Sequence, residues 1–254
     1  MISKNQIKFI QSLHSKKNRD EASLFIIEGV KLVTEFITNS HFQVKEVYAT
    51  TDYIEQQLPS LKRQSIVCVE VNQEELKKIS LQTTPNKVLA VVHAKPQALN
   101  PNLLYEGVTL YLDDIRDPGN LGTIIRIADW FGIKQVICSQ NCTELYNPKT
   151  LQASMGAVLR VTVVYMNFEE LQPHIEKLPI YGAVLNGETL YTSKLQKGII
   201  VIGNEANGIS QEVMSKIKYP ITIPAASNNG SESLNAANAC AMICSEFHRQ
   251  LNFQ

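Results

Sequence analysis

This 254-residue sequence lacks the features that mark several large classes of protein. It has no apolar stretch long enough to span a bilayer, and its N-terminus has no apolar signal-peptide core, so we expect neither a membrane protein nor a secreted one. Its five cysteines are an odd number without paired spacing, which does not predict a disulfide framework. The expectation is a soluble protein of the reducing cytoplasm.

Three fingerprints of nucleotide and acyl chemistry are also missing. The sequence contains no G-x-G-x-x-G, no G-x-x-x-x-G-K-[ST] and no G-x-S-x-G. It therefore supports neither a standard dinucleotide-binding fold nor a P-loop, and it carries no nucleophile elbow.

Cysteine and histidine do not predict a metal site. Cys240, Cys244 and His248 could share one face of a helix, and Cys138 and Cys142 are a further candidate pair. No matching Cys/His pair occurs elsewhere, and free cysteines commonly pack in protein cores. We therefore expect these residues in the core, with no metal bound.

The sequence has no net charge, because 24 basic residues balance 24 acidic ones. This balance argues against a protein that coats polyanions generally. The N-terminus is different, since five basic residues precede the first acidic residue, Asp20: Lys4, Lys8, Lys16, Lys17 and Arg19. The run is either a nucleic-acid footprint or a solvated helix face.

What is present indicates a folded α/β protein, with 44% hydrophobic and 19% charged residues. In residues 1–100, apolar strands such as "SLFIIEG" and "KVLAVVH" alternate with helical segments such as "VKLVTEFITN". Ser3 and Gln6 form a capping-box pattern that predicts a helix start. The segment 94–107, with two prolines and no clear period, is typical of a linker, so we place a boundary near residue 100.

Residues 101–254 predict a second domain built on a parallel sheet. Six short β-branched runs, "VTLYLDDI", "KQVICSQ", "VTVVYMN", "IYGAVLN", "GIIVIGNE" and "YPITIPA", are mostly separated by helical stretches. Continuous apolar strands of this kind are typical of a sheet covered on both faces. Ligands gather at the carboxyl ends of such strands, which directs attention to three loops.

The first loop opens the segment "RDPGNLGTIIRIADWFG", residues 116–132. Asn120 is a candidate helix N-cap, and Gly132 is a candidate terminator. Helical side chains lean toward the N-terminus, so Arg126 can run back over Gly122 toward Asn120 and place a cation at the helix mouth. The alternatives are that Arg126 extends into solvent or pairs with an acid, namely Asp113, Asp114 or Asp129.

The other two loops carry further polar candidates. In "GIIVIGNEANGIS", Gly203 and Gly208 would permit close backbone approach or a positive φ around Glu205. An ordinary turn with an exposed acidic residue would account for the same sequence. In "ITIPAASNNGSESLNAANACAMIC", Ser233 and Asn235 stand at a helix entrance, where Ser233 could simply be a cap.

Taken in order, these segments resemble the signature of the SpoU-type, or TrmH-like, RNA ribose 2′-O-methyltransferases of the SPOUT superfamily. The matching stretches are "DPGNLGTIIRIADWFGI", "LQASMGAVLRV", "VIGNEANGIS" and "IPAASNNGSESLN". "LFIIEGVKLVTE" and "TTPNKVLAVV" look like the N-terminal RNA-substrate-binding module of that family. The resemblance implies a deep trefoil knot in the C-terminal domain, which periodicity does not reveal, S-adenosylmethionine bound by the knotted loops, and a homodimer.

The resemblance also implies site residues. Asn120 and Arg126 would be catalytic, and the polar site would be completed by Glu205, Ser233 and Asn235. The cofactor loops would include Leu185, Gly203, Ile223 and Leu234. Two departures from the family pattern concern cofactor contacts: Ala206 replaces a glycine, and the loop "AASNNGS" (225–231) is about two residues longer than usual.

The implied function is methyl transfer from S-adenosylmethionine to a ribose 2′-hydroxyl of structured RNA, with ribosomal RNA favoured over transfer RNA. Since a guanidinium rarely releases its proton, Arg126 would stabilise the developing alkoxide, and a phosphate or water would take the proton. The alternatives are a transfer-RNA methyltransferase, a non-catalytic RNA-binding protein that keeps the fold, and an unrelated α/β enzyme. The small-residue stretch 236–241 suits close packing within one chain or between two.

Overall fold

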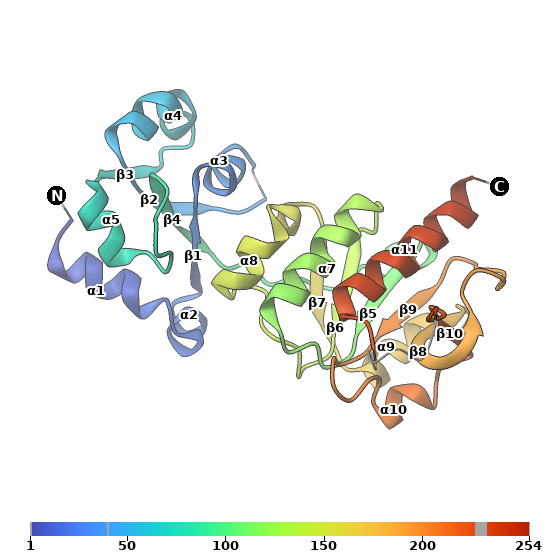
Figure 1. The fold of residues 1–254 in the computed structure, drawn as a ribbon. Coiled ribbons are helices and arrows are strands. Elements are labelled where there is room, and N and C mark those ends of the chain that lie inside the picture. Colours follow the sequence, from blue (N-terminus) through green and yellow to red (C-terminus); the bar gives the residue numbers. More distant parts are fainter. Residues whose placement is uncertain (1, 40, 227–232, 254) are drawn as a thin grey trace. The chain divides into compact units, whose positions relative to one another are not determined.

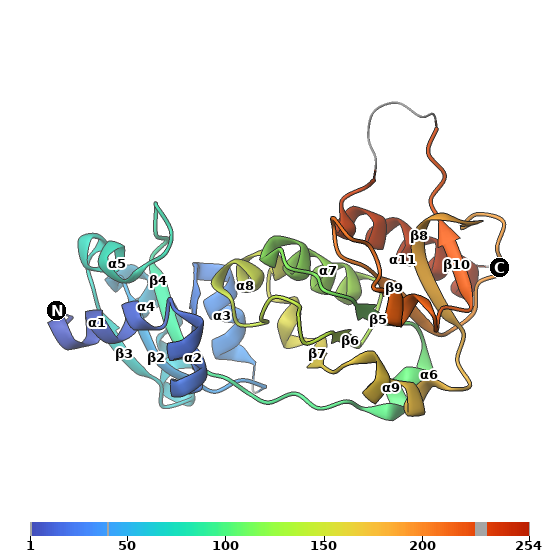
Figure 2. The ribbon, with the colours of Figure 1, turned by 90° about the horizontal axis from the view of Figure 1, so that it is seen from below.

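The structure is a computed structural model, and it describes residues 2–39, 41–226 and 233–253. The chain forms two compact units, one of Met1–Pro96 with Tyr146–Leu159 and one of Gln97–Leu145 with Arg160–Gln254 (Figures 1 and 2). The division at residue 96 lies close to the predicted boundary. The segment 146–159 is the exception, because it joins the N-terminal unit although the sequence placed it in the second domain.

The N-terminal unit contains a four-stranded mixed sheet in the order β1-β4-β2-β3. Strands β1 and β2 run antiparallel to β4, whereas β3 runs parallel to β2. The strands are β1 (Leu24–Glu28), β2 (Val44–Ala49), β3 (Val67–Glu70) and β4 (Val88–His93). The helices are α1 (Lys4–Ser12), α2 (Lys16–Ala22), α3 (Val30–Thr38), α4 (Thr51–Arg63), α5 (Gln73–Ile79) and α8 (Pro148–Ser154), which a 3₁₀ turn at Ala157–Leu159 follows.

The start of helix α1 confirms the predicted capping box. The backbone N–H of Gln6 donates to the Ser3 hydroxyl at 3.2 Å, and the N–H of Ser3 donates to the Gln6 side chain at 2.9 Å. Lys4, Lys8 and the two lysines at the start of α2 are exposed, but Arg19 is not. Its guanidinium donates to the carbonyls of Leu13 and His14 at 2.7 and 2.8 Å. The prediction that Arg19 belongs to an exposed basic face is therefore wrong.

Aromatic packing explains why the segment 146–159 belongs to the N-terminal unit. The ring of Tyr146 stacks on Phe25 with 4.4 Å between centroids, inside a cluster that includes Phe36 and Phe42. The Tyr146 hydroxyl also donates to the carbonyl of Lys95 at 2.8 Å. Contacts between residues so distant in sequence are not visible in local periodicity.

The C-terminal unit contains a six-stranded sheet in the order β10-β8-β9-β5-β6-β7, and every neighbouring pair is parallel. This confirms the predicted parallel α/β architecture. The strands are β5 (Thr109–Leu112), β6 (Gln135–Cys138), β7 (Thr162–Tyr165), β8 (Ile180–Thr189), β9 (Ile199–Ile202) and β10 (Tyr219–Thr222). The helices are α6 (Pro101–Glu106), α7 (Pro118–Trp130), α9 (Phe168–Ile175), α10 (Gln211–Met214) and α11 (Ala236–Asn252).

Helices cover both faces of this sheet, as the apolar strands predict. Helices α7 and α11 lie side by side on one face, and α6 and α9 lie on the other (Figure 2). On the second face, Phe168, Leu171 and Ile175 of α9 form one core with Tyr111 and Val201 of the central strands. Among the described residues, no helix is both long and apolar enough to cross a membrane.

Two predictions about local structure in this unit are corrected. The predicted linker 94–107 contains helix α6, whose N-cap Asn100 accepts a hydrogen bond from the N–H of Asn102 at 3.1 Å. Helix α7 is capped by Asp117 rather than Asn120, since the Asp117 carboxylate accepts the N–H of Asn120 at 2.7 Å. The predicted terminator is confirmed, because Gly132 has a φ of +72° directly after the helix ends.

Candidate functional site

A chain of side-chain hydrogen bonds joins the three loops that the sequence singled out. The Asn120 amide donates to the Glu205 carboxylate at 2.6 Å, and the Asn235 amide donates to the Asn120 carbonyl oxygen at 2.9 Å. These residues follow strands β5, β9 and β10, respectively, so the carboxyl ends of parallel strands bring them together. A carboxylate only accepts hydrogen bonds, which fixes the orientation of both amides.

The N-cap positions explain why these amides are available. Because Asp117 caps helix α7, the side chain of Asn120 is free to bridge two other loops. Helix α11 is capped by Asn235, whose side-chain oxygen accepts the N–H groups of Ala237 and Asn238 at 3.0 and 3.2 Å. The cap is therefore Asn235 and not Ser233, which is exposed beside it.

The turn after β9 is organised by Asn204, a buried residue that the sequence did not single out. Its amide donates to the carbonyl of Asp114 at 2.7 Å, and its side-chain oxygen accepts the N–H groups of Ala206 and Asn207 at 2.9 Å each. Two backbone hydrogen bonds with Gly208 close the turn at 2.9 and 3.0 Å. This side chain links the loops after β5 and β9, which a motif scan cannot detect.

Both predicted glycine effects in this turn are confirmed. A Cβ on Gly203 would lie 2.4 Å from the carbonyl carbon of Gly208 and 2.4 Å from the nitrogen of Ile209, so only glycine fits without movement. Gly208 has a φ of +67°. Ala206 is not among the residues with positive φ, so the turn does not need the glycine that the family pattern has there. The longer loop 225–231 falls mostly outside the described residues.

A cavity of about 790 Å³ opens beside the Glu205–Asn120–Asn235 chain. Its volume is in the range of small-molecule sites. All four predicted cofactor residues line it together with Glu205 and Ser233: Leu185, Gly203, Ile223 and Leu234. Leu185 and Leu234 are 68% and 50% exposed, so their apolar side chains border open space that a ligand could cover. A cofactor with both apolar and polar parts fits this lining.

Buried polar groups at the end of β5 hold the first loop in place. The Asp113 carboxylate is buried and accepts the N–H of Ser210 at 2.7 Å. Asp114 has a φ of +59°, and its N–H donates to the Ser139 hydroxyl at 2.9 Å. The N–H of Ile115 donates to the Cys142 sulfur at 3.2 Å.

These contacts also affect the two neighbouring thiols. A hydrogen bond with Cys138 has the largest effect on the pKa of Cys142 and lowers it. Hydrogen bonds with the Ser139 side chain and with two backbone N–H groups lower it further, whereas burial opposes these effects. The same thiol–thiol hydrogen bond and burial raise the pKa of Cys138. The sequence predicted cysteines in the core and missed that Cys142 supports the loop.

Arg126 is exposed and does not join this chain of hydrogen bonds. Within the described ranges, no hydrogen bond or ion pair involves its guanidinium. The predicted alternative of an acid partner is not found there either, because Asp114 pairs with Arg116, Asp129 pairs with Arg160, and Asp113 accepts from Ser210. Arg126 is thus a solvent-facing cation on helix α7.

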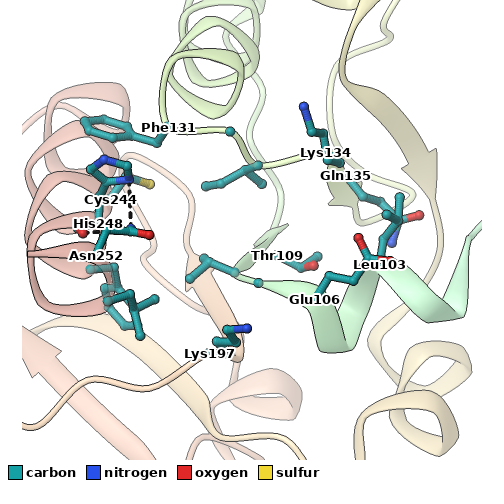
Figure 3. A pocket seen from close by; sticks show the side chains of 16 residues that line it. Leu103, Glu106, Thr109, Phe131, Lys134, Gln135, Lys197, Cys244, His248 and Asn252 are labelled. Atoms are coloured by element: carbon teal, nitrogen blue, oxygen red, sulfur yellow. Dashed lines mark hydrogen bonds between the residues drawn. The ribbon is translucent and has the colours of Figure 1, made fainter.

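A second cavity, of about 430 Å³, lies at the opposite end of the sheet, where strands β5 and β6 begin (Figure 3). It contains none of the predicted site residues. Its wall includes Cys244 and His248, and the His248 ring lies 5.6 Å from that of Phe131. The sulfurs of Cys240 and Cys244 lie 3.8 Å apart in the core, and the described residues contain no cluster of three potential metal ligands.

Comparison with known proteins matches two different family models to two parts of the sequence. Residues 107–245 match the sequence model of the SpoU rRNA Methylase family, and residues 4–90 match that of the MRM3-like substrate binding domain. The 23S rRNA (guanosine(2553)-2′-O)-methyltransferase of Bacillus subtilis (strain 168) is 29% identical over 245 residues, which are 94% of this chain and 95% of that protein.

Two solved structures resemble the whole chain. One is a Porphyromonas gingivalis protein assigned to the TrmH family of RNA methyltransferases, with 38% identity, a TM-score of 0.80, and coverage of 98% of this chain and 99% of that one. The other is an rRNA methyltransferase from Sinorhizobium meliloti with AdoMet bound, with 26% identity, a TM-score of 0.85, and coverage of 100% and 98%.

Proposed function

Because the chain belongs to the SpoU rRNA Methylase family, we propose that it transfers the methyl group of S-adenosylmethionine to a ribose 2′-hydroxyl of ribosomal RNA. One observation carries the proposal for this chain. Three segments far apart in sequence meet in the Glu205–Asn120–Asn235 chain, beside a cavity lined by the residues expected to bind the cofactor.

The cavity would hold S-adenosylmethionine mainly through its loops. Leu185 and Leu234 would cover apolar parts of the cofactor, while the glycine at 203 lets two backbone segments approach closely at the wall. When bound, the cofactor supplies an electrophilic methyl group on a sulfonium, which is already a good leaving group. The protein must therefore place the 2′-oxygen in line and about 3 Å from that methyl group.

The polar residues would position and polarise the nucleophile. Asn120 is held from both sides, so it can present a fixed amide to the ribose without losing side-chain freedom on binding. Arg126 would stabilise negative charge on the 2′-oxygen, since a guanidinium donates hydrogen bonds and keeps its proton. A phosphate oxygen or water would take the hydroxyl proton.

We also infer a homodimer, which would bring Arg126 to an active site. Arg126 and Trp130 lie one helical turn apart on α7, and both are exposed, Trp130 by 84%. Met242, which is 40% exposed, lies on the adjacent helix α11. An interface over this surface would cover the tryptophan, and analytical ultracentrifugation of the wild type and Trp130→Lys tests it; a monomeric wild type would contradict it.

The trefoil knot is likewise part of the proposal. It is supported by hydrogen bonds that join the segment after β8 to two elements later in the chain, strand β10 and helix α11. The N–H of Leu190 donates to the carbonyl of Thr222 at 2.9 Å, and the side chain of Gln250 in α11 binds the N–H of Leu195 and the carbonyl of Ser193 at 3.1 Å each. Such contacts are expected where the C-terminal chain passes through that loop.

The N-terminal unit would contribute RNA affinity through the exposed lysines at positions 4, 8, 16 and 17. The five cysteines are all free thiols, which supports a reducing compartment such as the cytoplasm.

The decisive experiment compares Arg126→Ala with the wild type in methyl transfer to ribosomal RNA. We expect the variant to fold and to bind S-adenosylmethionine by calorimetry, but to lose about 100-fold or more in methyl transfer, the usual effect of removing one donor to a developing oxyanion. Near-normal turnover would refute the role of Arg126. Failure of the wild type to bind the cofactor or its demethylated product would leave an RNA-binding protein without this activity.

A further inference from the structure

A second arginine, Arg116, lies in the segment that leads to Asn120, close enough to Glu205 to be affected by its charge. It lies between strand β5 and helix α7, directly before the capping residue Asp117 and four residues before Asn120. Its Nε donates to a carboxylate oxygen of Asp114 at 2.9 Å. The arginine side chain is 69% exposed, whereas that of Asp114 is only 19% exposed.

Asp114 is an unusually firm anchor for an exposed arginine. Its φ of +59° lies in the left-handed region, which residues with a Cβ rarely adopt and which asparagine and aspartate tolerate best. Its N–H donates to Ser139, and its carbonyl accepts the amide of Asn204. Because both backbone groups are held, the carboxylate has a fixed position from which it orients Arg116.

The charges around Arg116 indicate what it could bind. The segments around Arg116 carry the carboxylates of Asp114, Asp117 and Glu205. Asp114, with a smaller effect from Glu205, raises the pKa of Arg116. A phosphodiester approaching three carboxylates is repelled unless a cation offsets them. Arg116 is such a cation, and its bond to Asp114 occupies only one of its five N–H donors.

We propose that Arg116, oriented by Asp114, binds a backbone phosphate of the RNA strand that presents the target ribose. The inference rests on the proposed function, because it takes the Asn120 side of the cavity as the place where the ribose enters. Each ribose 2′-hydroxyl lies next to a phosphate in the chain, so a cation four residues from Asn120 is suitably placed. The planar guanidinium also matches the geometry of phosphate oxygens.

The test uses the full-length protein and ribosomal RNA, with Arg116→Ala, Arg116→Lys and Asp114→Asn, and with Lys197→Ala as the matched control. Lys197 is an exposed cation that lines the second cavity, at the opposite end of the sheet. Asparagine tolerates the left-handed backbone at position 114, so that variant should fold. Cofactor affinity, kcat, the KM for RNA, and RNA affinity across salt concentrations are measured for each.

For Arg116→Ala we expect the KM for RNA to rise about 10-fold and the slope of log affinity against log salt to become shallower by about 0.7–0.9, the change for one lost phosphate contact. We expect kcat to change less than about 2-fold, and cofactor affinity to be unchanged. Arg116→Lys should keep the salt slope while raising KM about 3-fold, because the charge remains and the planar fork is lost.

Asp114→Asn separates anchoring from simple electrostatics. Removing a carboxylate alone should tighten RNA binding, whereas loss of the anchor should raise KM about 3-fold. The proposal is overturned if Arg116→Ala matches Lys197→Ala in KM and salt slope, if its main defect is in kcat or cofactor binding, or if Asp114→Asn tightens RNA binding. RNA affinity is measured without cofactor, so this result stands apart from any failure of methyl transfer.

Discussion

Replacing Gly203 by alanine tests whether the wall of the proposed cofactor cavity depends on close backbone packing. The new Cβ would lie 2.4 Å from two backbone atoms, whereas ordinary contacts begin at 3.4 Å, so the strands of the turn must separate by about 1 Å. Overpacking of this kind costs about 1–3 kcal/mol, and it occurs here in a residue that lines the cavity. We expect Gly203→Ala to bind S-adenosylmethionine about 10- to 100-fold more weakly, the equivalent of that energy.

Two other glycines provide matched controls, because alanine there adds backbone strain without a collision. Gly208 and Gly132 have φ values of +67° and +72°, and a Cβ at either position would have no atom within 4 Å. Both variants should lose about 1–2 kcal/mol of unfolding free energy, the cost of a left-handed alanine. Gly208 lines the same cavity, whereas Gly132 lies at the far end of helix α7.

The assay is urea unfolding of the three variants followed by calorimetric titration with S-adenosylmethionine. Gly132→Ala should be destabilised but should bind the cofactor normally, so loss of affinity cannot be attributed to loss of stability alone. A Gly203→Ala protein with wild-type stability and wild-type cofactor affinity would refute the packing argument. Equal affinity losses in Gly203→Ala and Gly132→Ala would refute the location of the cofactor.

Three further predictions concern other parts of the molecule. Asn120→Ala removes two hydrogen bonds among exposed groups, so it should cost less than about 1 kcal/mol of stability but lower single-turnover methyl transfer at least about 10-fold, with cofactor binding retained. Arg19→Ala should destabilise the fold by about 1–3 kcal/mol in urea, since one buried and one partly buried carbonyl lose their donor, whereas alanine at the exposed lysines 4, 8, 16 and 17 should leave stability unchanged and flatten the salt dependence of RNA binding. Hydrogen bonds from Arg249 and then Gln250 lower the pKa of Glu246 to about 2 from its ordinary 4.5, so its stabilising effect is complete above pH 4.5 and is lost as pH falls toward 2. Glu246→Gln should therefore be destabilised by about 1–2 kcal/mol at pH 6 and approach the wild type at pH 3 in urea unfolding; an equal difference at both pH values would contradict this.

The strands were predictable because their signal is local. Runs such as "GIIVIGNE" are short, β-branched and bounded by turn residues, and the central strand β9 is buried along its length. Two helices that contain proline were not predicted. Helix α4 has Pro59 inside it, and α6 begins at Pro101 in a stretch that was interpreted as a linker. In both, tertiary packing decides the structure: Leu61 and Leu104 are buried.

The candidate site was only partly predictable, for a related reason. Asn120, Glu205 and Asn235 follow different strands, and the rule that ligands gather at carboxyl ends brings them to one edge. The residues that support this site from neighbouring loops could not be predicted in this way. Asn204 and Ser139 act by binding backbone groups of the loop after β5, so neither belongs to a recognisable spacing pattern. Only coordinates could show that these two side chains fix the loop that leads to Asn120 by binding the backbone of Asp114.

The position of Arg126 also follows from helix geometry. Six residues separate it from Asn120, which is about 9 Å along the axis and about 120° around it. The two side chains therefore cannot leave the helix on one face, and Arg126 shares its face with Trp130, four residues on. Asn120 is directed to loops of its own chain, whereas Arg126 faces solvent. If both act on one ribose, either the long arginine side chain turns back along α7 when RNA binds, or Arg126 serves the site of a second subunit. Only the second possibility makes methyl transfer depend on the surface around Trp130.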